Sequence, residues 1–341
     1  MSLRTLNLSA SILHYVLAAG FSAYFVYINN KYPNSSIQGI DLSTRDHTLE
    51  ITKLSTINQC NSLQSCYRDL SCNDLSSNNN SLICDSSQNC VYPHFTSTTT
   101  NTIDISVIQG LLVSFFLITG TFHLFYYLGG KGIHMEKDEK GLYQPVEVEE
   151  EQSSFSTFYT RMIYKKNNYL RWIEYSITAT LMLYIIAWTS GVKDTGVYML
   201  LYATNIAMIA QGQLVEEAIR DGKNWRIPMI TGFILLLAEF SVIIRTFYMR
   251  LNEFSSFVNN PENSNVIGNQ QVPKWLQIMI WVLFIFFSCF GIVSLVGTQS
   301  GVSYESVEKG YIILSFVAKA TLGAFIAYGT SQRQKNQWKV K

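Results

Sequence analysis

Long apolar runs alternate with polar connections along the chain, and each run has about the length of one membrane crossing. A helix needs about 20 apolar residues to cross ~30 Å of hydrocarbon. Runs of this length occupy residues 9–28, 105–128, 168–189, 196–217, 227–248, 275–297 and 306–330. The pattern therefore predicts an all-α fold, a bundle of seven transmembrane helices with one large polar loop between the first two.

Composition agrees with this class and divides the chain into segments. Only 14% of the residues are charged and 48% are hydrophobic, as in an integral membrane protein. We expect a short segment at 1–8, a first helix at 9–28, a polar loop at 29–104, the other helices and the site at 105–330, and a basic tail at 331–341. The net charge of +1 gives no reason to expect nucleic acid as a partner.

The polar loop contains five of the six cysteines, which are Cys60, Cys66, Cys72, Cys84 and Cys90. Cysteines this dense in a polar segment indicate disulfides in an oxidising compartment, and their odd number allows at most two bridges within the loop. Their spacing favours no metal site. Asn34 and Asn79 begin N-x-S sequons and are candidate glycosylation sites.

These cysteines also predict the orientation of the bundle. If 29–104 is extracellular, the N-terminus is cytoplasmic, the C-terminus is extracellular, and the basic connections 129–167 and 218–226 are cytoplasmic. Those connections then obey the positive-inside rule, whereas the basic tail 331–341 opposes it. We expect a multi-pass protein of the plasma membrane, surrounded by the lipid bilayer.

A single lysine, Lys319, lies in the middle of the last apolar run, where an ammonium group is costly unless a function retains it. An amine removed from water gives up its proton more readily and can condense with an aldehyde to form a Schiff base. A protonated Schiff base needs a buried anion. Glu174, the only acidic residue of its run, is the candidate.

Other polar residues within the runs form a candidate proton network. At 1.5 Å per residue, the inner halves of their helices contain His14, His123, Glu174, Glu216 and Glu217. One internal cavity is expected to hold Glu174, the two histidines and Lys319, with the polar cluster on its cytoplasmic side. The alternatives are a helix-to-helix hydrogen bond for each histidine and an interfacial position for Glu216 and Glu217.

Two short motifs resemble one family. Arg171-Trp172-Ile173-Glu174-Tyr175-Ser176 and Ser315-Phe316-Val317-Ala318-Lys319 are similar to the corresponding segments of heliorhodopsins, and His14 and His123 fall where that family has histidines. The resemblance implies a seven-helix photoreceptor of inverted topology, with all-trans retinal on Lys319 and Glu174 as its counterion, in a homodimer. The long cysteine-rich loop departs from the family pattern.

The resemblance also assigns expected roles to neighbouring residues. Ser315 occupies the position where ordinary microbial rhodopsins usually have an acid, and Ile185 the position of the proton donor in outward pumps, so a pump of that design is not expected. Arg171 either orients Glu174 or anchors its helix at the interface. Ser176, Thr178 and Ser315 are expected to tune hydrogen bonding, and Trp281 is expected to be either a wall of the chromophore site or a packing residue.

Three functions remain open from the sequence. The first is a photosensory receptor that signals to an unknown cytoplasmic partner. The second is a light-gated proton or cation conductor using Glu239, Glu174 and Glu216 or Glu217, unless Glu239 is a protonated packing residue or pairs with Arg245. The third is a transporter or carotenoid-binding scaffold without photochemistry. An enzyme is not expected, because no nucleophile and base motif occurs.

Overall fold

A computed structural model describes residues 2–31, 40–44, 49–53, 83–84, 90–95, 98–103, 105–131, 135–137, 143–145, 155–258, 274–299 and 301–338. These residues form two compact units, Met1–Ile40 with Ile103–Lys341, and Asp41–Thr102. The candidate disulfide residues Cys60, Cys66 and Cys72 and the sequons at Asn34 and Asn79 lie outside the described residues.

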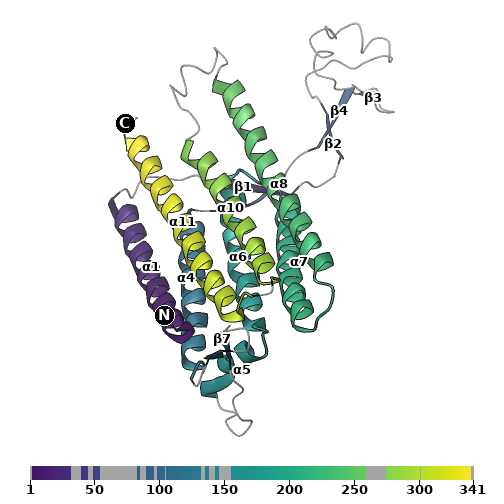
Figure 1. The fold of residues 1–341 in the computed structure, drawn as a ribbon. Helices are drawn as coiled ribbons and strands as arrows, with labels where there is room; N and C mark the ends of the chain where they lie inside the picture. Colours follow the sequence, from purple (N-terminus) through teal and green to yellow (C-terminus); the bar gives the residue numbers. More distant parts are fainter. Residues whose placement is uncertain are drawn as a thin grey trace. The chain divides into compact units, whose positions relative to one another are not determined.

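Seven long helices form the larger unit and close into a ring. They are α1 (Leu3–Lys31), α4 (Ile105–Leu128), α6 (Tyr169–Thr189), α7 (Thr195–Arg220), α8 (Arg226–Val258), α10 (Lys274–Val296) and α11 (Tyr304–Trp338). Each helix packs on the next in this order, and α11 packs back on α1 (Figure 1). The expected seven-helix bundle, with a large connection between its first two long helices, is confirmed.

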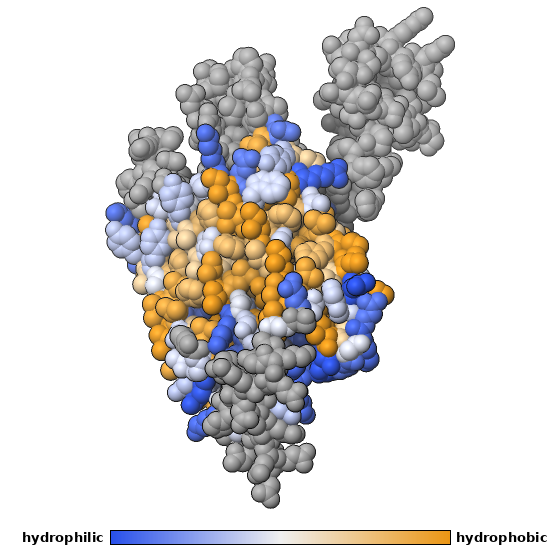
Figure 2. Space-filling view, in the orientation of Figure 1, coloured by the Kyte–Doolittle hydropathy of each residue, from blue (hydrophilic) through white to orange (hydrophobic). Residues whose placement is uncertain are grey.

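The surface of the ring suits hydrocarbon. Among the described residues, α1, α4, α8, α10 and α11 are each long and apolar enough to cross a membrane. Figure 2 shows apolar side chains across the middle of the visible face and hydrophilic ones toward its two ends. The remaining two helices, α6 and α7, carry charged residues such as Arg171 and Glu216, which are buried inside the bundle. Their charges therefore face protein and not lipid.

Local signals set several helix ends. Asn168 caps α6 by accepting a hydrogen bond from the Arg171 amide at 3.3 Å, and Asp194 caps α7 by accepting one from Val197 at 3.0 Å. Beyond α7, Gly222 adopts a φ of 66°, which favours glycine. By contrast, α8 and α11 continue past their expected ends at 248 and 330. The apolar pattern marks only the part of a helix that is in hydrocarbon, whereas backbone hydrogen bonds extend it further.

A short element between α4 and α6 was not expected from the sequence. The 3-10 turn η2 (Phe155–Thr157) leads into α5 (Phe158–Tyr164), and β6 (Met135–Lys137) pairs with β7 (Tyr143–Pro145). Backbone bonds from Tyr159 and Thr160 to the Gly129 carbonyl, at 3.0 and 3.3 Å, join α5 to the end of α4. Thus α5 caps one end of the bundle.

The smaller unit consists of short strands. In it β2 (Leu49–Lys53) and β3 (Ile83–Cys84) flank β4 (Cys90–Phe95), and β1 (Ile40–Thr44) pairs with β5 (Thr98–Ile103). The antiparallel register sets Cys84 opposite Cys90. This is a register in which directly opposed residues are close neighbours.

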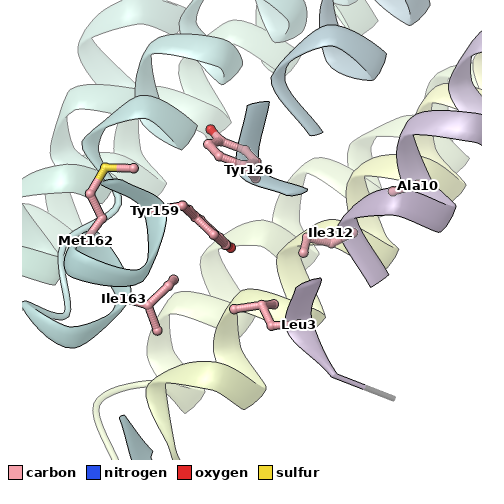
Figure 3. Close-up of a cluster of buried hydrophobic side chains, with 7 residues drawn as sticks. All are labelled: Leu3, Ala10, Tyr126, Tyr159, Met162, Ile163 and Ile312. Atoms are coloured by element: carbon pink, nitrogen blue, oxygen red, sulfur yellow. The ribbon is translucent and has the colours of Figure 1, made fainter. Parts of the chain in front are cut away.

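Two clusters of buried side chains connect the helices. The first, which we call the α5 cluster, joins α1, α4, α5 and α11 through Leu3, Ala10, Tyr126, Tyr159, Met162, Ile163 and Ile312 (Figure 3). The second, the aromatic cluster, joins α6, α7 and α11 through Trp172, Tyr175, Ile209 and Tyr311. The Lys319 side chain contacts this second cluster, with Nζ 5.6 Å from the centre of the Tyr175 ring.

The close packing of α6 on α7 generates a prediction about Gly212. A Cβ atom at this position would lie 2.4 Å from the Trp172 ring, and the Trp172 indole is bonded to Glu216 and has little room to move. We expect Gly212→Ala to lower the free energy of unfolding by about 1–3 kcal/mol, as overpacking does. Thermal unfolding in detergent measures this. In the control Gly20→Ala, where nothing lies within 4 Å of the new Cβ, stability should be unchanged or higher.

Candidate functional site

The Lys319 ammonium group lies inside the bundle with a full set of acceptors. Its Nζ donates to Thr119 Oγ1 at 2.6 Å, to Ser315 Oγ at 2.9 Å and to Glu174 Oε1 at 3.2 Å. Lys319 is 2% exposed and Glu174 is 1% exposed. An ammonium group has three N–H donors, so α4, α6 and α11 together provide one acceptor for each. The structure thus brings together Lys319, Glu174 and Ser315, and adds Thr119, which the sequence analysis did not identify.

The two buried histidines lie beside this site, and their hydrogen bonds fix their tautomers. His14 Nδ1 is 2.7 Å from the Ala10 carbonyl, which can only accept, so Nδ1 carries the hydrogen. Asn7 donates its Nδ2 to the Leu3 carbonyl at 3.1 Å, so its Oδ1 faces His123 Nδ1 at 2.8 Å. His123 Nδ1 must then donate as well. In both neutral rings Nε2 is a free proton acceptor, and neither Nε2 has a hydrogen-bond partner.

Arg171 forms a second buried ionic group, separate from Lys319. Its guanidinium pairs with Glu216 on α7 and Glu308 on α11, and it lies 4.2 Å from the centre of the Tyr311 ring. Of the two roles considered for Arg171, the interfacial anchor is wrong, because the residue is 3% exposed. The orienting effect on Glu174 stays a prediction, and the described ion pairs of Arg171 are with Glu216 and Glu308. A planar guanidinium with five donors is better satisfied by two carboxylates than by one already bonded to Lys319.

Glu216 is the centre of this second group. It accepts hydrogen bonds from the Trp172 indole at 2.7 Å, from the Asn168 amide at 2.9 Å and from the Tyr304 hydroxyl. The expected interfacial position of Glu216 is therefore wrong, because the residue is buried. Its neighbour Glu217 is half-buried and accepts a hydrogen bond from Gln213 at 3.0 Å.

Glu308 was missed from the sequence although it was visible there. It is an acidic residue inside the last predicted run, 306–330, and is 1% exposed. Its position near the start of α11 resembles that of an interfacial residue. The structure shows instead that it is buried and accepts hydrogen bonds from Asn168 and Arg171 at the start of α6.

A cavity extends from Lys319 between α6, α7, α8, α10 and α11. It contains about 840 Å³ of empty space, part of which is open to the surroundings. Aromatic rings form much of its wall, and these are Trp172, Tyr175, Phe233, Phe287, Phe290 and Tyr311. Thr178 and Ser315 also line it. An apolar cavity with one amine in its wall suits a long apolar molecule that carries one reactive polar end.

Two residues expected at the chromophore site, Trp281 as a wall and Ser176 to tune hydrogen bonding, do not line this cavity. Trp281 is 42% exposed and is not part of the cavity lining, since its side chain extends toward Tyr248, 3.5 Å away. Ser176 donates to the backbone carbonyl of Trp172 at 2.8 Å instead of lining the cavity. The wall assigned to Trp281 is made by Phe287 and Phe290, which face inward from the same helix.

Glu239 on α8 is isolated. It is 1% exposed, both carboxyl oxygens are buried without a hydrogen-bond partner, and among the described side chains no ion pair joins it to Arg245. The pairing considered from the sequence is therefore not formed. A buried carboxyl group without any partner is costly in a structural role.

A family comparison identifies the chain. The family model for heliorhodopsin matches residues 152–331. The chain belongs to the heliorhodopsin family. The match contains Glu174 and Lys319 together with all of α6, α7, α8 and α10. It makes this chain an integral membrane protein of a light-sensing, retinal-binding family.

Solved structures of other rhodopsins are similar to the chain. A light-driven proton pump from Leptosphaeria maculans shares 13% identity at a TM-score of 0.42, covering 67% of this chain and 85% of that one. The transmembrane domain and linker region of a Salpingoeca rosetta rhodopsin phosphodiesterase shares 16% identity at a TM-score of 0.41, covering 69% and 63%. No curated protein matches the chain.

The two neighbouring glutamates of α7 provide a test of the Arg171 group. We expect Glu216→Gln to lower the free energy of unfolding by about 3–5 kcal/mol, because it leaves part of a buried ion pair uncompensated. Glu217→Gln, the same chemical change one residue away, should cost within about 0.5 kcal/mol. Unfolding of both variants in mixed micelles measures the difference. Equal decreases in the free energy of unfolding would contradict a stabilising ion pair between Glu216 and Arg171.

Proposed function

We propose that this heliorhodopsin is a photosensory receptor whose retinal is bound to Lys319, with Glu174 as the counterion. The observation that supports this most is the position of Lys319 Nζ, in the wall of the aromatic cavity and 3.2 Å from Glu174 Oε1. No other described lysine is buried inside the bundle.

The residues present fit the chromophore. All-trans retinal would be held by the Lys319 amine through its aldehyde, with the loss of one water, and would supply light absorption and isomerisation. A nitrogen linked in this way would carry one N–H, where the free ammonium group has three. Among Glu174, Thr119 and Ser315, only Glu174 has a negative charge to stabilise a positive nitrogen in this dry site. The cavity aromatics exclude water from it.

The neighbouring histidines, His14 and His123, are suited to accept a proton released from Lys319. Each has a buried Nε2 without a hydrogen-bond partner among the described residues, and the centroids of the two rings are 5.5 Å apart. A proton moved from Lys319 to this pair places a charge beside α1, α4 and the α5 cluster. We propose that the resulting rearrangement is the signal, read by an unknown cytoplasmic partner.

Several further properties complete the proposal. The N-terminus is cytoplasmic, the C-terminus is extracellular, the protein resides in the plasma membrane as a homodimer, and it has no enzymatic activity. The polar loop 29–104 is extracellular, and its cysteines form disulfides there.

The pigment itself tests the role of Glu174. We expect Glu174→Gln to lose the native visible band after addition of all-trans retinal, because no other carboxylate of the described residues lies within hydrogen-bonding distance of Lys319 Nζ. Glu174→Asp retains the charge and should retain a visible band, shifted in wavelength. Absorption spectra of the purified proteins measure both. An unchanged spectrum in Glu174→Gln would exclude Glu174 as the counterion.

A second candidate function, light-gated proton or cation conduction, is supported by Glu239. Its buried and unpartnered carboxyl group is difficult to explain by packing alone. Together with Glu174 and with Glu216 or Glu217, it would form a discontinuous series of acidic groups on α6, α7 and α8.

Whole-cell photocurrents decide between the two functions. Conduction predicts a light-evoked current that reverses with the proton gradient and falls at least tenfold in Glu239→Gln. The matched control is Glu305→Gln, a residue paired with Lys309 near the start of α11, which should conduct normally. Absence of current from a pigmented protein shown to be at the cell surface leaves the sensory function.

A further inference from the structure

Buried side chains join α6 to α11 across the interior of the bundle. The two helices are not neighbours in the ring, so their side chains make the bonds between them. Arg171 of α6 pairs with Glu308 of α11, and Glu174 of α6 pairs with Lys319 of α11. At a level of α11 between these two ion pairs, Tyr175 of α6 donates a hydrogen bond to a backbone carbonyl. Tyr175 therefore makes an uncharged link between the same two helices.

The Tyr175 hydroxyl bonds to α11 on the side of the helix that carries Lys319. It lies 3.2 Å from the Tyr311 carbonyl oxygen, and both residues are buried. Tyr311, Ser315 and Lys319 follow one another at intervals of four residues, so they lie along one side of α11. The Tyr311 carbonyl also accepts the helical bond of the Ser315 amide, and Ser315 Oγ accepts from Lys319 Nζ at 2.9 Å. A displacement of this carbonyl therefore also displaces the turn that holds the ammonium group.

The Tyr175 ring is held in place by its neighbours and lies beside the amine. Its centre is 5.6 Å from Lys319 Nζ, a distance at which an aromatic ring attracts a cation. Trp172 and Phe290 meet the ring edge-on, with centroids 6.3 and 5.4 Å away. Glu174 precedes Tyr175 on α6, so the carboxylate and the ring approach one ammonium group from adjacent positions of the same helix. Any sliding of α11 along α6 would change the distance between Lys319 Nζ and Glu174.

We propose that Tyr175 is a positioning residue that fixes the height of α11 against α6 and so keeps the Lys319 nitrogen beside Glu174, an inference that rests on the proposed photosensory function. The hydroxyl of Tyr175 and the carboxylate of Glu174 contact α11 at points eight residues apart, which is about 12 Å of helix. Two contacts this far apart oppose sliding of α11. A nitrogen linked to retinal would have one N–H, and this alignment directs it to the carboxylate and not to Ser315 or Thr119.

Resonance Raman spectra of the pigment test this role. Deuteration lowers the C=N stretching frequency by an amount that grows with the strength of the N–H bond to its acceptor. Tyr175→Phe retains the ring and loses the hydroxyl. We expect its visible band at longer wavelength and a smaller deuterium shift, because a more distant Glu174 stabilises the charge on the nitrogen less.

The matched control for this experiment is Tyr24→Phe. It also removes a hydroxyl that lies 3.2 Å from a backbone carbonyl of α11, that of Ala327, but it leaves the cavity wall unchanged. The wavelength and the deuterium shift of this variant should equal those of the native pigment. Native values in Tyr175→Phe, or equal changes in both variants, overturn the proposal.

A measurement without retinal separates this inference from the proposed function. Solid-state NMR of the full chain gives the dipolar coupling between lysine ¹⁵Nζ and glutamate ¹³Cδ atoms. Loss in Glu174→Gln identifies the signal of Lys319 with Glu174, and the separate pair of Lys309 with Glu305 is the internal reference. In Tyr175→Phe the first coupling should fall about twofold, because one bond that aligns the helices is lost, whereas the control variant should retain it.

The two failures are distinguishable. An unchanged coupling between Lys319 and Glu174 in Tyr175→Phe refutes the positioning role, whether or not a pigment forms. A weakened coupling in this variant, together with a native chain that forms no pigment, supports the positioning of the ammonium group and refutes only the photosensory function.

Discussion

A buried ammonium group on α11 must be neutralised, and this constraint accounts for much of the bundle. Lys319 lies inside the apolar helix bundle. Three acceptors, one each from α4, α6 and α11, stabilise the charge of its ammonium group. Since α6 and α11 are not neighbours in the ring, the ion pair between Glu174 and Lys319 joins them across the interior of the bundle. If retinal were linked to Lys319, the positively charged nitrogen would need the same acceptors.

A second buried charge, Arg171, is handled separately. Glu216 and Glu308 neutralise it from α7 and α11, while Trp172 and Tyr311 cover its faces. The two ionic groups lie on the same helix, since Arg171 precedes Glu174 by one turn. The helix α6 therefore carries two buried charges one turn apart with different partners: Arg171 pairs with Glu216 and Glu308, and Glu174 pairs with Lys319.

The sequence predicted the number of helices and the Lys319 and Glu174 pair, because an isolated charge in an apolar run is conspicuous in one dimension. It did not predict the partner of Arg171, since Glu216 and Glu308 are far from it in sequence and resemble interfacial residues. Thr119 gives no signal, because threonine is common in apolar helices. Trp281 was misplaced because periodicity does not tell which side of α10 faces the cavity. The helix α5 was missed because it is too short for an apolar run.

If Lys319 is the residue that binds retinal, the covalent link must lie on its side chain. Borohydride reduction of the pigment followed by peptide mass spectrometry identifies the modified lysine. We expect a retinyl mass on the peptide that contains Lys319 and on no other. A retinyl group on another lysine, or none on a protein that has acquired visible colour, would contradict it.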